Sequence, residues 1–172
     1  MQEDNSKDYL RLHTGILLAG ATGVFGRLIS LAELPLVWYR MIIAAAVLAL
    51  VIRMSHRLSL PNKAHLLRIG FCGVLLAIHW TLFYASIKAS NVSIAVVCIA
   101  LNGFFTAIIE PLAGHRRLSP RELMLSMITL VGILLIFGLD TRHRTGIILG
   151  TFSALFYTLF AVASKRVQYH TG

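Results

Sequence analysis

The chain has 172 residues, of which 57% are hydrophobic and only 13% are charged, and its formal net charge is +9. This composition excludes an ordinary soluble domain, because it contains repeated apolar runs near the ~20 residues that a membrane helix needs. We therefore expect an all-α polytopic membrane protein with about six transmembrane helices. The predicted spans are residues 15–32, 35–52, 66–87, 92–112, 123–137 and 146–164.

The first predicted span, residues 15–32, is rich in glycine and alanine. Small residues let helix backbones approach closely in lipid, so we expect this helix to pack inside a bundle. Residues 1–14 are polar and are expected to form a cytoplasmic tail. The second span starts at Pro35, and proline suits the first turn of a helix.

Short connections organise the rest of the chain. Only residues 88–91 separate the third and fourth spans, which predicts a tight antiparallel hairpin. Ser119 and Pro120 match a helix N-cap followed by proline at the first helical position, so we expect the fifth helix to start there. Cys72 and Cys98 fall at different depths of their spans, and no disulfide is expected between them.

Two segments suggest an internal repeat. Residues 14–18 and 145–149 share the pattern Thr-Gly-Ile-(Leu or Ile)-Leu and are five spans apart. An odd number of spans places the second copy upside down in the membrane, as in inverted-repeat transporters. We expect residues 15–138 to form a first five-helix repeat and residues 145–172 to begin a second, truncated one. Chance similarity between apolar segments is the alternative.

The distribution of basic residues argues against nucleic-acid binding. If the spans alternate, eleven lysines and arginines fall on one side of the membrane and three on the other. This is the positive-inside pattern, and it predicts a multi-pass protein of the cell (inner) membrane with a cytoplasmic N-terminus. The eleven are Lys7, Arg11, Arg53, Arg57, Lys63, Arg68, Arg116, Arg117, Arg121, Lys165 and Arg166, and the three are Lys88, Arg142 and Arg144.

Residues 101–119 and 132–136 resemble the fourth and fifth helices of an EamA-type repeat of the drug/metabolite transporter superfamily, and residues 20–27 and 35–40 resemble its first two helices. The resemblance implies ten spans in two five-span repeats and transport of small metabolites, often outward. Six spans alone would leave half a cavity open to lipid. We therefore expect either a truncated copy of a longer protein or an obligate oligomer such as a homodimer.

This chain departs from the EamA pattern at two positions. Gly103 stands where the family often has proline, so we expect a weaker helix break there. Arg116 stands where the family often has glutamate, and the nearest acidic residue is Glu110.

Three ionisable side chains fall inside predicted spans, where each costs ~2.5–3.5 kcal/mol at a helix centre. Arg27 and Arg40 lie at similar depth in the outer part of the membrane and are candidates to hold a carboxylate or phosphate of a substrate. Alternatively, they reach the interface and pair with Glu33. Glu110 is a candidate for coupling or gating near the cytoplasmic edge, with pairing to a loop cation as the alternative.

A polar stripe follows the fourth span, where Cys98, Asn102, Thr106 and Glu110 recur every four residues. Such a stripe covers about one third of the helix circumference and is expected to face the bundle interior. Asn102 lies near the midplane, where transporters bind substrate, and is a candidate substrate-binding residue. The alternative is a hydrogen bond between helices.

Aromatic residues provide the remaining candidates. Trp80 is predicted to bind substrate by stacking or cation–π contact, and Tyr157, on a short polar face with Ser153, is predicted to line the same pathway. His79 is a candidate for proton coupling, with a hydrogen-bonded packing role as the alternative. Tyr84 shares a face of the third span with Trp80, and a position in the aromatic belt at the lipid interface is the alternative for it.

These patterns together predict a small-metabolite transporter, an exporter by resemblance, that works by alternating access between two inverted repeats. The alternative is a non-transporting accessory or scaffold protein of the membrane. Neither catalytic nor metal-ligating residues cluster in the sequence, so we expect no enzyme activity, metal or cofactor. The expected partners are a small-molecule metabolite and the lipid bilayer.

Overall fold

The structure, a computed structural model, describes residues 6–54, 62–114, 117, 119–137 and 142–169. These residues form helices and connections without a strand, which confirms the all-α prediction. The helices are α1 (Ser6–Leu28), α2 (Glu33–Met54), α3 (Lys63–Ala89), α4 (Val92–Ile99), α5 (Leu101–Leu112), α6 (Pro120–Phe137) and α7 (Arg144–Tyr169).

Four stretches of this chain are long and apolar enough to cross a membrane: α2, α3, α7, and α4 together with α5. They confirm a polytopic helical membrane protein. The other two predicted spans are also helical, as α1 and α6, but do not reach the same length and hydropathy on their own. The first turns of α1 contain charged residues, and the 18 residues of α6 include Arg121 and Glu122, which lowers the mean hydropathy of both helices. That both cross the membrane stays a prediction.

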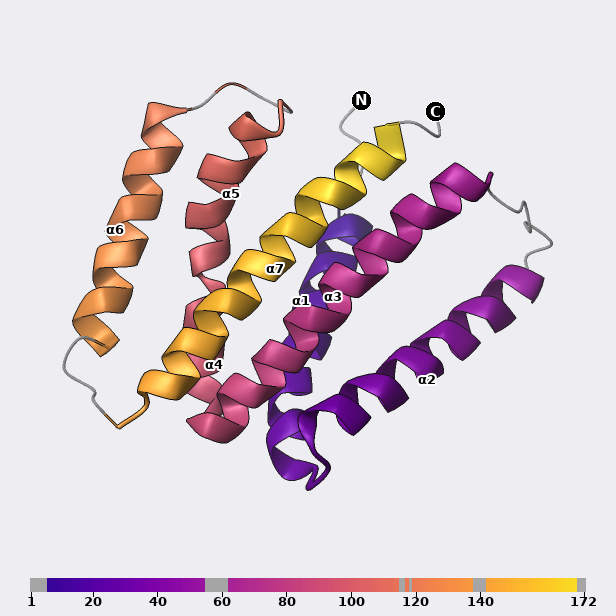
Figure 1. Cartoon of the computed structure of the whole chain (residues 1–172), viewed down its shortest axis with the longest axis horizontal. Coiled ribbons are helices and arrows are strands. Elements are labelled where there is room, and N and C mark those ends of the chain that lie inside the picture. The colour runs from indigo at the N-terminus through magenta and orange to yellow at the C-terminus, as the bar shows by residue number, and fades with distance from the viewer. Residues whose placement is uncertain (1–5, 55–61, 115–116, 118, 138–141, 170–172) are drawn as a thin grey trace.

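The helices run alternately up and down, so the bundle has two ends (Figure 1). We call the end where α1 begins and α7 finishes the terminal end. The opposite end, where residues 89–92 connect α3 to α4, is the hairpin end. The hairpin is as tight as predicted, and Asn91 caps α4 by accepting a hydrogen bond from the Ile94 amide at 2.9 Å.

α7 is the central helix of the bundle. It lies between α3 and α5 and also packs against α4 (Figure 1). α1 packs against α3 and α4, whereas α2 packs mainly against α3 and α6 mainly against α5. α2 and α6 are therefore peripheral and expose apolar side chains, among them Leu48 and Leu135, as a lipid-facing helix does.

Glycines explain the close approach of α7 to its neighbours. A Cβ atom on Gly146 would overlap the Ser90 side chain, and one on Gly150 would lie 2.8 Å from the Cys98 Cβ. The small residues of α1 are used less fully than expected. Gly26 abuts the Tyr84 ring, but a Cβ on Gly15 would meet nothing within 4 Å.

Three boundaries refine the predicted ones. α1 begins at Ser6, so the described part of the predicted tail is helical rather than extended. The fourth span is broken at Ala100, whose amide bonds to the Val97 carbonyl at 3.0 Å in a tighter turn, one turn before the expected weak point at Gly103. Ser119 caps α6 as predicted, accepting from the Glu122 amide at 3.5 Å.

Both cysteines are buried and free. Part of each boundary of the predicted repeats, at residues 138–141 and 170–172, lies outside the described residues, as do the predicted loop cations Arg57 and Arg116.

Candidate functional site

Aromatic side chains gather where α3 crosses α7. We call His79, Trp80, Phe83 and Tyr84 of α3, with Tyr157 of α7, the aromatic cluster. The ring centroids of His79 and Tyr157 lie 5.1 Å apart, and those of Trp80 and Tyr84 lie 5.7 Å apart in a stacked arrangement. Residues 79, 80, 83 and 84 share one face of α3 because they are separated by one helical turn.

Arg40 of α2 joins this cluster. Its Nη1 donates to the Tyr84 hydroxyl at 2.9 Å, and its guanidinium carbon lies 3.5 Å from the centre of the Trp80 ring. A cation over an indole face is stabilised by ~0.5–2 kcal/mol, more where water is excluded. Tyr84 is buried and holds Arg40, so it does not act as the interfacial residue that the alternative interpretation assumed.

His79 and Ser153 link α3 to α7 by buried hydrogen bonds. The His79 Nδ1 lies 2.9 Å from both the carbonyl and the hydroxyl oxygen of Ser153, and the hydroxyl lies 3.2 Å from the His79 carbonyl. All the groups are satisfied if Nδ1–H donates to the Ser153 carbonyl and the hydroxyl donates to the His79 carbonyl. In this assigned tautomer the Nε2 atom of His79 keeps its lone pair.

Arg27 lies nearer the hairpin end. Its Nη1 donates to the Ile87 carbonyl at 3.4 Å, one turn of α3 beyond Tyr84. Neither Arg27 nor Arg40 pairs with Glu33. Lys88 does, with its Nζ 3.8 Å from the carboxylate, and its Nζ also donates to the Leu31 carbonyl. The partner of Glu33 is therefore Lys88, which the sequence had not indicated for this role, and not Arg27 or Arg40.

The polar stripe of the fourth span is directed toward α7 at both of its ends. The Cys98 thiol is buried 3.8 Å from the Ile147 carbonyl, and Glu110 is buried against α7. Between them, the Asn102 side-chain oxygen is buried without a hydrogen-bond donor among the described residues. This oxygen therefore forms no hydrogen bond between helices in the described residues. An unpaired buried acceptor costs ~1–3 kcal/mol, which a donor on a ligand would recover.

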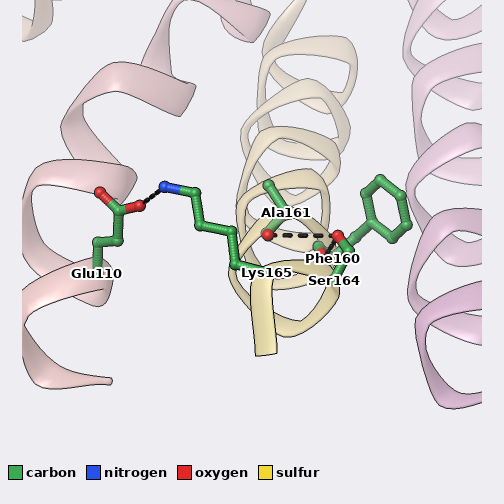
Figure 2. A network of polar contacts seen from close by, with 5 residues as sticks. All are labelled: Glu110, Phe160, Ala161, Ser164 and Lys165. Atoms are coloured by element: carbon green, nitrogen blue, oxygen red, sulfur yellow. Dashed lines mark hydrogen bonds and ion pairs between the residues drawn. The ribbon is translucent and has the colours of Figure 1, made fainter. Parts of the chain in front are cut away.

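Glu110 pairs with Lys165 near the terminal end, and the two side chains point toward each other from α5 and α7 (Figure 2). The Glu110 side chain is only 5% exposed, whereas that of Lys165 is 51% exposed. The alternative prediction of a cationic partner for Glu110 is met by Lys165, which lies on a helix.

The structure brings Arg40, Trp80, His79 and Tyr157 into one continuous set of contacts across α2, α3 and α7. It leaves Arg27, Asn102 and Glu110 apart from that set in the described contacts. Sequence reasoning missed Ser153 as the partner of His79, Tyr84 as the partner of Arg40, and Lys165. The spacing of Ser153 and Tyr157, one turn apart, was the signal for the first of these.

No group of three or more histidine, cysteine, aspartate or glutamate side chains that could hold a metal occurs in the described parts of the chain. The polar groups described above instead contact arginines, hydroxyls and aromatic rings. Such groups can bind an organic solute by ionic, stacking and hydrogen-bonding interactions.

Long apolar helices with polar groups buried between them define a polytopic α-helical membrane protein. Residues 9–138 match the EamA-like transporter family, and since this match covers most of the chain, the protein belongs to that family. No curated protein and no solved structure matches the chain significantly. The protein is thus a membrane transporter of the drug/metabolite superfamily, whose members are transporters rather than enzymes and act on small molecules in a lipid environment.

Proposed function

We propose that this protein exports a small metabolite by alternating access, and that the substrate binds beside Arg40 at the crossing of α3 and α7. The observation that carries the proposal is the position of Arg40. Its charge lies on the Trp80 ring and bonds to a tyrosine hydroxyl, with no carboxylate among its described partners. A cation within a membrane that lacks an anionic partner is available to an anionic group of a substrate.

The other proposed binding residues extend the site beyond this position. Arg27 lies about one helical turn closer to the hairpin end and provides a second cation. Tyr157 is 39% exposed and lies against His79, so its ring can contact a bound solute. Asn102 offers a buried acceptor that a substrate donor would satisfy.

The directions of α1 and α7 support the inverted-repeat part of the proposal. α1 ends at the hairpin end, where Gly26 meets Tyr84, whereas α7 begins there, where Gly146 meets Ser90. The two segments with similar opening sequences therefore run in opposite directions, as inverted repeats require. The second repeat would rock against the first around the site.

For coupling, we propose His79 and Glu110. The Nε2 atom of His79 can take a proton within the aromatic cluster, because Nδ1 is engaged by Ser153. Glu110 would gate the terminal end through its ion pair with Lys165. Described basic residues at the helix ends gather at the terminal end, which we assign to the cytoplasm of a cell (inner) membrane protein. A homodimer would close the substrate cavity that six spans alone leave open to lipid. The mass of the purified protein tests for the dimer.

Transport by the reconstituted protein tests the site. We expect Arg40→Gln and Asn102→Ala to lower the flux of a transported metabolite at least tenfold in proteoliposomes, because each removes a group that contacts substrate. Arg11→Gln is the matched control, since Arg11 is exposed on α1 and its ion pair in the described part of the chain is with the exposed Asp8. Wild-type flux in both site variants would overturn the site. Absence of flux for every metabolite in the wild type would favour the accessory-protein alternative.

A further inference from the structure

A cavity of about 670 Å³ lies at the terminal end, between α3, α5 and α7 and away from the aromatic cluster. Its floor includes the buried side chains of Cys72, Leu75 and Val162. Ligand sites in proteins commonly have volumes of ~300–1,000 Å³, so this cavity has the size of a binding site.

The cavity extends to the apolar surface of α3. Leu67 and Phe71 line it and are 76% and 59% exposed, so its mouth is flanked by side chains that face hydrocarbon in a bilayer. Water would be a poor occupant, because the walls offer it few polar partners. An acyl chain matches both the walls and the surroundings.

Two arginines line the same cavity. Arg68 lies near the start of α3 and Arg166 near the end of α7, which is the level at which the helices leave the apolar region. Arg166 is held over the cavity by donating to the Ala113 carbonyl, another lining residue, at 2.7 Å. Glu110, next to the lining residue Ile109, does not itself line the cavity and pairs with Lys165.

We propose that this cavity binds an anionic phospholipid, with an acyl chain between α3, α5 and α7 and the phosphate between Arg68 and Arg166. Guanidinium groups bind phosphate through two parallel hydrogen bonds. Basic pockets between membrane helices are known to recognise anionic lipid headgroups. The bound lipid would add to the direct contacts that already join the end of α7 to α5, such as the hydrogen bond from Arg166 to the Ala113 carbonyl.

Native mass spectrometry of the full chain tests the proposal. The protein is released from micelles that contain equal amounts of phosphatidylglycerol and phosphatidylethanolamine with identical acyl chains. We expect the wild type to retain phosphatidylglycerol preferentially. Arg68→Gln should weaken its retention by about fivefold and the Arg68→Gln/Arg166→Gln variant by about 25-fold, at ~1 kcal/mol for each charge. Arg121→Gln, an exposed arginine at the same end that does not line the cavity, should retain lipid as the wild type does.

A second variant separates the cavity from the charges. Ala163→Phe places a ring inside the cavity and should reduce retention of phosphatidylglycerol while leaving both arginines in place. Equal retention of the two lipids by the wild type would overturn the proposal, as would an equal loss in Arg121→Gln. A dimer that carries no lipid would also overturn it, since a second copy would then cover the cavity.

Discussion

α1 and α7 contain nearly the same five residues, at positions 14–18 and 145–149, yet the protein uses the two helices differently. Gly146 of α7 is pressed against Ser90, whereas its counterpart Gly15 in α1 has open space around it. Ser153 of α7 bonds to His79 of α3. Its counterpart Thr22, 131 residues earlier, bonds within the described residues to the Leu18 carbonyl of its own helix, at 3.0 Å. Similar sequence therefore makes both segments helical, while position in the bundle decides which side chains form contacts between helices.

Substitution of the paired glycines should show the largest difference. Gly146→Val is expected to lower the free energy of unfolding by about 1–3 kcal/mol, because the new side chain overlaps Ser90 and the backbone of α3 cannot move away without losing other contacts. Gly15→Val should leave it within about 0.5 kcal/mol of the wild type. Unfolding in mixed micelles by titration with dodecyl sulfate measures both. Equal losses would show that α1 is packed as closely as α7.

Breaking the ion pairs of α7 and α1 should give the second largest difference in the free energy of unfolding. Lys165→Met is expected to cost about 1–2 kcal/mol, because it leaves the buried Glu110 charge without its lysine; the figure is below that of a fully buried pair because Lys165 is half exposed. Arg11→Met, which breaks the exposed pair with Asp8, should cause no measurable change in the same assay.

A double variant sharpens this contrast. Lys165→Met/Glu110→Gln should recover most of the loss, since the buried carboxylate that has lost its lysine is then replaced by a neutral amide. A double variant that is less stable than Lys165→Met would contradict the assignment of the cost to the buried carboxylate.

The hydroxyl groups should give the smallest difference. Ser153→Ala is expected to cost about 0.6 kcal/mol and at most about 1.7 kcal/mol, the range for hydrogen bonds between membrane helices. Thr22→Val should be neutral, because its hydroxyl serves only its own helix. A double-mutant cycle with His79→Ala isolates the bond. A coupling energy of zero would mean that His79 and Ser153 do not stabilise the crossing of α3 and α7.

Periodic apolar runs and end signals made the helices predictable, because these features act locally. The hairpin at residues 88–91, the Ser119 cap and the alternation of the helices all follow from neighbouring residues. Arg40, Trp80, His79 and Tyr157 were likewise found as candidates, since polar and aromatic groups inside apolar runs stand out.

Partners were harder to predict, because they depend on contacts between distant helices. Pairing of the two intramembrane arginines with Glu33 was the alternative to substrate binding, but in the structure Lys88, at the end of α3, pairs with Glu33. A loop cation was the alternative partner predicted for Glu110, and nothing in the sequence indicated that α7 places Lys165 opposite it. The break at Ala100 also had no clear signal, since alanine favours helix and the weak residue in the sequence is Gly103.

The hydrogen bonds between α3 and α7 impose an order on biogenesis. Ser86 donates to the carbonyl of Gly146 at 2.7 Å and His79 bonds to Ser153, so these α3 groups have partners 60 and 74 residues later in the chain. At ~5–20 residues per second, a ribosome takes several seconds to make the intervening chain. During that time α3 must remain beside the insertion machinery or its water-filled path, because free lipid offers these polar groups no partner.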